Sequence, residues 1–210
     1  DGCLCLVGSE MCIRDSYAGA YDDAFISRYA VTESGTYYLK VGKYYYDTAA
    51  DSYELQVDVA RGIQQESDAN YSNGSIGSAN LVTLREVGAE QQATISGNIM
   101  APEGSYDYDV FALGRLNSGN SILLETTMPS TSALAPVVTL WNAQGNMIAD
   151  SDGNYTDGDF SATLMLDSDY YAQVEHGFVY NGHTYLLSRD GMSWTAAQAY
   201  AEQFGGHLVT

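Results

Sequence analysis

The chain has 210 residues and is strongly acidic, with 27 Asp and Glu against 8 Lys and Arg and a formal net charge of −19. Such a charge repels phosphate backbones and anionic membrane surfaces, which argues against nucleic-acid binding, whereas divalent cations are attracted. Apolar residues make up 45% of the chain, and 18 tyrosines and 21 glycines accompany only 3 prolines. This composition predicts a globular, mainly β protein with a packed core. No apolar run is long enough for membrane insertion.

The N-terminal segment is interpreted as foreign to the protein. Residues 6–16, LVGSEMCIRDS, are identical to one reading frame of a transposon-end adapter used in sequencing-library preparation. We therefore expect residues 1–16 to be adapter-derived and to carry no function. An ordinary apolar N-terminal strand or a signal-peptide remnant is the alternative. All three cysteines of the chain, Cys3, Cys5 and Cys12, lie in this segment, so they are not taken as a metal or redox site.

Short runs of alternating apolar and polar residues predict β-strands in the middle of the chain. Gly, Asn, Asp and Ser separate these runs, which cover residues 92–100, 108–113, 121–127 and 137–142. No helical period occurs before the C-terminal end, so the pattern indicates an antiparallel β-sandwich. Residues 61–79 are rich in turn-forming types and are expected to form a linker.

Two stretches of the chain resemble each other and indicate an internal repeat. Residues 21–41 run from an acidic turn through an alternating strand to the pair Tyr37–Tyr38. Residues 155–174 repeat this order up to Tyr170–Tyr171. Because the earlier strands precede only the second copy, we expect one complete sandwich preceded by the C-terminal part of another.

A series of short motifs resembles the bacterial pre-peptidase C-terminal domain. The motifs are ESDAN at 66–70, AN at 79–80, YDYDVF at 106–111, VTLWNAQG at 138–145 and YYAQV at 170–174. The resemblance implies a jelly-roll-like sandwich of the kind appended to secreted proteases and other bacterial surface proteins. In those proteins such domains serve targeting, substrate adhesion or calcium-dependent stiffening, and the location implied here is secreted or at the cell surface.

The pattern changes after Glu175. Residues 178–185 predict a short hairpin, and Ser193 is expected to cap a helix that ends before Gly205–Gly206. One face of this helix carries the residues expected to be buried, namely Trp194, Ala197, Ala201 and Phe204.

This C-terminal string resembles the opening of a C-type lectin-like domain, in which a strand, a helix with Trp near its start and a Gly-Gly-His-Leu exit follow in this order. Ala201 stands where that family usually has a disulfide cysteine. No sugar- or calcium-binding residue of the family can be carried over. Because most of such a domain would follow, we expect the helix to lack its packing partner and to fray.

These patterns divide the chain into four expected parts. From the N-terminus they are an adapter-derived segment (1–16), the C-terminal part of a first sandwich (17–62), a complete sandwich with its linker (63–176) and a fragment of a C-type lectin-like domain (177–210).

An acidic run at residues 150–159, DSDGNYTDGD, is a candidate calcium site. It places oxygen ligands between glycines that let the backbone wrap a cation, and calcium takes about six to eight such oxygens. The spacing is not that of an EF-hand. A solvated hairpin loop is the alternative, since Asp, Asn and Gly also form ordinary turns. The candidate ligands are Asp150, Asp152, Asn154, Asp157 and Asp159.

Asp107 and Asp109 flank the start of a predicted strand, so their side chains should share one face. They are expected to complete the calcium site, with Glu66 or Asp68 from the linker as further ligands. Solvated charge at a sheet edge is the alternative.

The sequence contains no catalytic motif of a familiar kind. The three histidines lack metal-binding spacing, and neither a Gly-x-Ser-x-Gly elbow nor a phosphate-binding glycine loop is present. We therefore expect a non-enzymatic binding, adhesion or spacer region, directed at glycans or other extracellular polymers. The competing hypotheses are an accessory region that targets a secreted peptidase to its substrate and a purely structural stalk.

Overall fold

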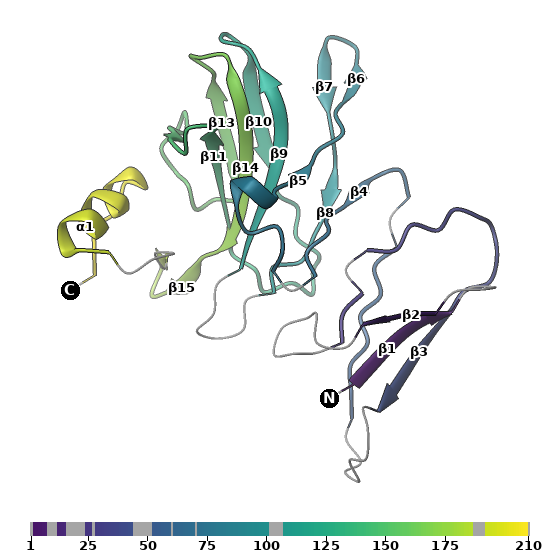
Figure 1. Cartoon of the computed structure of the whole chain (residues 1–210). Helices are drawn as coiled ribbons and strands as arrows, with labels where there is room; N and C mark the ends of the chain where they lie inside the picture. Colours follow the sequence, from purple (N-terminus) through teal and green to yellow (C-terminus); the bar gives the residue numbers. More distant parts are fainter. Residues whose placement is uncertain are drawn as a thin grey trace.

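The computed structural model describes residues 2–7, 12–15, 24–26, 28–43, 52–59, 61–69, 71–100, 107–186 and 192–209. The chain is mainly β, and its centre is a two-layer arrangement of strands (Figure 1). The larger layer is a five-stranded sheet in the order β12 (Met147–Ile148), β11 (Pro136–Asn142), β14 (Ser168–His176), β9 (Tyr108–Leu116) and β5 (Asn80–Leu81). The smaller layer pairs β10 (Ser121–Glu125) with β13 (Asp159–Thr163).

The core lies between these two layers. Leu140 and Tyr170 come from the five-stranded sheet, Phe160 and Ala162 come from β13, and all four are buried. β13 contributes alternate residues to this core because successive side chains of a strand point to opposite faces. β11 does not follow this pattern, since its adjacent residues Val137 and Val138 are both buried in the core cluster.

Three of the four strands predicted in the middle of the chain are present as β9, β10 and β11. The strand expected at 92–100 is wrong in its extent. The hairpin of β6 (Arg85–Val87) and β7 (Glu90–Gln92) ends where it should begin, and only β8 (Ile95–Ser96) lies inside it. Most residues of this segment are exposed, and the segment does not join the five-stranded sheet. Its alternating pattern therefore does not produce a continuous strand.

The expectation of purely antiparallel pairing is corrected at the linker. β4 (Gln64–Gln65) pairs in parallel with β8, and β5 pairs in parallel with the start of β9. Residues 61–79 also contain a short 3-10 helix, η2 (Ile76–Ser78). The predicted linker is therefore packed alongside the sandwich, because its backbone takes up the hydrogen bonds left at the edge of β9.

The N-terminal strands form a separate three-stranded sheet in the order β2 (Cys12–Asp15), β1 (Gly2–Val7) and β3 (Tyr38–Lys43). β3 carries Tyr38 from the first repeat copy, as β14 carries Tyr170 and Tyr171 from the second. Residues 21–23 at the start of the first copy lie outside the described residues. The adapter origin of residues 1–16 stays a prediction, since pairing as a strand does not report where a segment came from.

The C-terminal elements form as the sequence indicates. β15 (Phe178–Tyr180) and β16 (His183–Tyr185) make a hairpin whose turn residues Asn181 and Gly182 both have positive φ, the geometry that Asn-Gly favours. The helix α1 (Trp194–Gln203) begins at Ser193, whose hydroxyl accepts a hydrogen bond from the Ala196 N–H at 3.3 Å. Within the described residues α1 is the only α-helix, and it is too short to cross a membrane.

The burial expected for α1 is met only in part, because no residue of the helix is fully buried. Ala197, Ala201 and Phe204 are half-buried, whereas Trp194 is 64% exposed. The expectation that the helix lacks a packing partner is also corrected. The ring of Phe204 meets that of Tyr155 edge to face at 5.6 Å and packs on the sandwich core. Contacts therefore cross the boundary expected at residue 177, while the division into domains stays a prediction.

The docking of α1 leads to a first prediction. Phe204→Ala should lower the free energy of unfolding by about 1–2 kcal/mol, less than the loss for a fully buried Phe, and should speed amide exchange throughout α1. The matched control, Trp194→Ala, should change it by less than about 0.5 kcal/mol because its side chain is exposed. Urea unfolding and hydrogen exchange measure both effects. Equal losses for the two variants would show that α1 does not dock through Phe204.

Candidate metal centre

A cluster of buried acidic residues lies where the linker meets the start of β9. Glu66 and Asp68 follow β4, and Asp107 and Asp109 stand at the beginning of β9. Asp109 is paired with Val174 on β14 and lies two residues before the buried Phe111, so its side chain shares the face that carries the apolar core. The acidic residues are therefore held inside the fold and not at a solvated edge.

Hydrogen bonds hold the linker to β5 and to β9. Ser67 and Asn80 bond reciprocally, since the Ser67 N–H donates to the Asn80 side chain at 2.6 Å and the Asn80 amide donates to the Ser67 carbonyl at 3.1 Å. The Val110 N–H of β9 donates to the Asn73 carbonyl at 3.2 Å. These bonds bring together side chains that lie about forty residues apart in sequence.

Three buried carboxylates lie close enough together that they could hold a metal ion. Asp68, Asp107 and Asp109 each offer a carboxylate oxygen, and these oxygens all lie within 4.8 Å of one another. The three side chains are 0%, 4% and 3% exposed, and Glu66 beside them is 3% exposed. Charged carboxylates are rarely buried without a cationic partner. The hydrogen bonds that Asn73, Asn98 and Met100 donate to this cluster all come from amide N–H groups.

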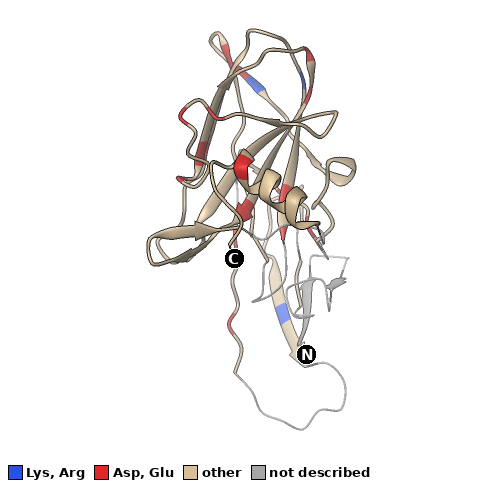
Figure 2. Ribbon diagram, turned by 90° about the vertical axis from the view of Figure 1, so that its left-hand side faces the viewer, with Lys and Arg blue, Asp and Glu red and all other residues tan. Residues whose placement is uncertain are grey.

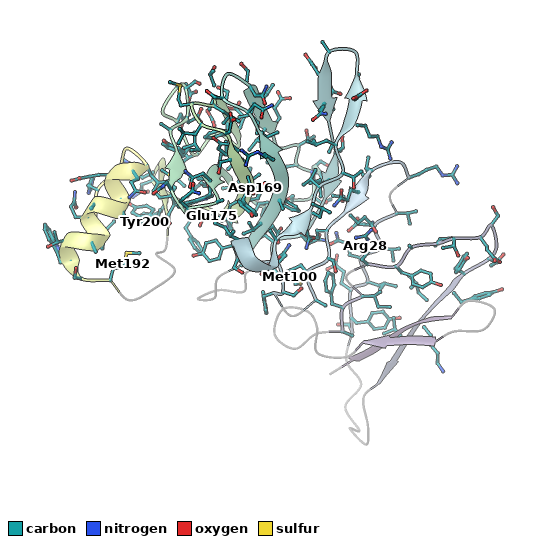
Figure 3. All side chains as sticks on the ribbon, turned by 45° about the horizontal axis from the view of Figure 1, so that its top comes forward. Arg28, Met100, Asp169, Glu175, Met192 and Tyr200 are labelled. Carbon is teal, nitrogen blue, oxygen red and sulfur yellow. The ribbon has the colours of Figure 1, made fainter. Side chains whose placement is uncertain are left out.

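Backbone and side-chain amides supply part of the hydrogen bonding. The N–H groups of Asn98 and Met100 donate to Glu66 and Asp107, respectively. Met100 is labelled in Figure 3 at this end of the sandwich.

Asn73 donates twice to the cluster. Its backbone N–H bonds Asp68 and its side-chain amide bonds Asp109, each at 3.1 Å. The side-chain oxygen of Asn73, which is fully buried, has no hydrogen-bond partner, and neither has Oδ1 of Asp107. Buried acceptors normally have a donor or an ion. A divalent cation bound among these oxygens would supply the missing partner of both. The buried residues present here therefore fit a metal ion.

Burial determines the protonation of the cluster. It raises the pKa of Asp107 to about 6 and also raises that of Asp68. Glu66 and Asp109 act as a pair. Burial raises the pKa of each, and the nearby Glu66 carboxyl raises that of Asp109 further. Without a cation the cluster therefore retains protons near neutral pH.

The loop at residues 150–159 is arranged differently. Its side chains bond within the loop: Asp152 accepts from the Asn154 N–H at 2.8 Å, and the Asn154 amide donates to Asp157 at 2.9 Å. Asp159 is fully exposed, and the pKa of its carboxyl is raised chiefly by the neighbouring charge of Asp157. These are the turn-stabilising bonds that a solvated loop also makes.

Asp150 is the one predicted loop ligand that is buried, and its Oδ1 accepts from the Ser161 N–H at 3.1 Å. The structure brings Asp107 and Asp109 together with Asp68, one of the two linker residues named as possible further ligands. It does not bring the loop residues into that group of three. Nor do the loop charges contribute to the pKa shifts of the buried carboxyls.

Sequence reasoning missed two contributors to the site. The first is Asn73, whose amide bonds Asp109. An amide side chain within an acidic linker is the sequence feature that could have indicated this role. Gly97 is the other, because a Cβ at this position would lie 2.8 Å from Cδ of Glu66. No sequence pattern marks that approach, since β8 and Glu66 meet only through the parallel pairing.

Comparisons with known proteins supply no relative: no family model, no curated protein and no solved structure matches the chain. Figure 2 shows acidic segments on many elements of the ribbon and few basic ones.

The raised pKa values predict how stability depends on pH in the metal-free protein. A carboxyl whose pKa is higher in the folded state holds a proton that the unfolded chain has released, so its contribution is largest at low pH and is lost as pH rises through the folded pKa, about 6 for Asp107. In chelator, the melting temperature should therefore fall between about pH 5 and pH 8.

The matched variants separate this effect from the rest of the chain. The double variant Asp107→Asn, Asp109→Asn should flatten the pH dependence, whereas Asp152→Asn, in the exposed loop, should leave it unchanged. A melting temperature that rises over this interval, or an equal response in both variants, would contradict burial of protonated carboxyls.

The close approach at Gly97 gives a further prediction. Gly97→Ala should displace the Glu66 carboxyl, which the Asn98 N–H holds in place, and should cost about 1–3 kcal/mol of stability. Gly77→Ala is the control, because a Cβ there meets nothing within 4 Å. Denaturant unfolding compares the two variants. A neutral Gly97→Ala would mean that Glu66 moves freely and is not part of an ordered cluster.

Proposed function

We propose that this region is a non-catalytic, calcium-stabilised module of a secreted or surface protein, in which a cation joins the linker to the sandwich. The observation that carries the proposal is the group of three buried Asp oxygens within 4.8 Å of one another. Asp68 comes from the linker, and Asp107 and Asp109 come from the start of β9. A cation bound by all three would add a direct link between segments that otherwise meet through hydrogen bonds, such as those that join Asn73 to Asp109 and Val110.

The chemistry of the ligands favours calcium. They are all oxygens, from carboxylates and the Asn73 amide, with no sulfur or imidazole nitrogen that zinc would prefer. Magnesium keeps several of its own waters and demands an octahedral shell, whereas calcium accepts a larger and less regular set of protein oxygens. A site made by fully buried side chains therefore suits calcium better than magnesium.

A role in binding or spacing follows from what a cation does at this position. Fixing the linker sets how the sandwich is presented relative to the chain before it, which is useful in an adhesion or targeting module. The residues of the cluster also carry the resemblance to the pre-peptidase C-terminal domain, which supports a secreted or surface location. The acidic composition of the chain also supports an extracellular location, because extracellular modules bind calcium at weak sites.

Calorimetry on the full chain tests the proposal. Calcium at about 100 times its dissociation constant should stabilise the folded state by about 2.7 kcal/mol, which raises the melting temperature by about 5–10 °C. Magnesium at the same concentration should raise it less. Asp107→Asn and Asp109→Asn should each abolish most of the shift.

The loop provides the matched control. The double variant Asp157→Asn, Asp159→Asn removes two exposed acidic residues without touching the buried group and should keep the full calcium shift. Identical melting in calcium and in chelator would overturn the proposal. A shift lost in the loop variant but kept in Asp107→Asn would place the calcium site in the loop.

A further inference from the structure

A cleft of about 360 Å³ lies between the end of α1 and the turn that joins β11 to β12. Its walls belong to parts of the chain that are about fifty residues apart. The residues that line it are Gly145, Asn146, Met147, Ala149, Tyr155 and Gln203. The cleft is widely open to solvent, and its volume alone is comparable to that of small-molecule sites, about 300–1,000 Å³. No residue of this lining belongs to the metal centre.

The walls of the cleft are held in place. On one side Phe204, directly after Gln203, packs on Tyr155 at 5.6 Å and on Tyr200 at 5.2 Å. Tyr200 lies on the side of α1 toward the sandwich (Figure 3). The phenol of Tyr155 is fixed in turn, because its hydroxyl accepts a hydrogen bond from the Asp150 N–H at 3.2 Å.

The opposite wall is an ordered turn. The Asn142 side-chain oxygen accepts from the N–H groups of Gln144 at 3.0 Å and Asn146 at 2.9 Å, and the Asn142 N–H donates to the Asn146 carbonyl at 3.0 Å. The backbone N–H and carbonyl of Asn146 are therefore both hydrogen-bonded to Asn142. Its side chain makes no hydrogen bond to any described residue. The same holds for the side chain of Gln203.

The lining is uncharged, although the chain has 27 acidic residues. Two amide side chains from opposite walls offer both donors and acceptors, and Met147 and Tyr155 provide apolar surface. An amide group that donates and accepts at once is suited to hydroxyls, which do the same. A charged ligand would gain no ionic partner from this lining.

We propose that this cleft binds an uncharged, hydroxyl-rich small molecule, namely a neutral sugar residue, through the amides of Asn146 and Gln203. The inference deepens the binding role proposed above by naming a ligand class, and it rests on that role. The cleft and the metal centre share no residue, so each can fail without the other.

Titration of the full chain by NMR tests the proposal, with glucose, galactose and N-acetylglucosamine as probes and glucuronate as the charged counterpart. Neutral sugars should shift the amide signals of residues 145–149 and Gln203, with dissociation constants of about 1–10 mM. Asn146→Ala and Gln203→Ala should each weaken binding by about fivefold, the effect of losing one hydrogen bond. Both side chains are exposed, so both variants should fold as the parent does.

Gln144→Ala is the control, because its exposed side chain lies on the same turn but does not line the cleft. It should leave the titration unchanged, and the response should be the same in calcium and in chelator. No shift with any neutral sugar up to about 50 mM would overturn the inference. So would stronger binding of glucuronate, or shifts that Asn146→Ala and Gln203→Ala leave unaffected.

Discussion

The buried carboxyl cluster is the constraint on which the arrangement around the sandwich depends. Taking four acidic side chains out of water is costly unless they are protonated, hydrogen-bonded or bound to a cation. Asn73, Asn98 and Met100 supply amide donors, and burial raises the pKa of Glu66 and of Asp109, which favours their protonated forms. The bond from Asn73 to Asp109 requires the linker to lie directly against β9, and the bond from Asn98 to Glu66 holds the linker next to the segment that follows β8. The linker is therefore positioned by electrostatics as much as by its short parallel strands.

The apolar core and the acidic cluster meet on one strand. β9 contributes Phe111 to the core and Asp109, two residues earlier, to the cluster. Its antiparallel pairing with β14 runs almost the whole length of both strands, with one irregularity where Gly114 adopts a φ of 80°. A strand held this firmly can present carboxylates at fixed separations, which is what a cation site needs.

The loop that follows β12, the edge strand opposite β5, connects two features that the sequence presents separately. The acidic run contains Tyr155, on which Phe204 from α1 packs. The loop therefore carries a group of acidic side chains and also contacts the C-terminal helix. Its glycines and acidic residues are explained by turn formation, and its buried aromatic ring is explained by docking.

The sequence by itself determined the strands β9, β10 and β11, the Asn-Gly hairpin turn and the capped helix α1, because each depends on a local period or on the backbone preference of a few residues. It also indicated that Asp107 and Asp109 share a face and that Glu66 or Asp68 could join them. Only the tertiary structure decided that these residues assemble without the acidic loop, that Asn73 completes the group and that Phe204 rests on Tyr155. Those contacts join residues far apart in sequence, and their geometry is set by how sheets and linker pack, which no local pattern encodes.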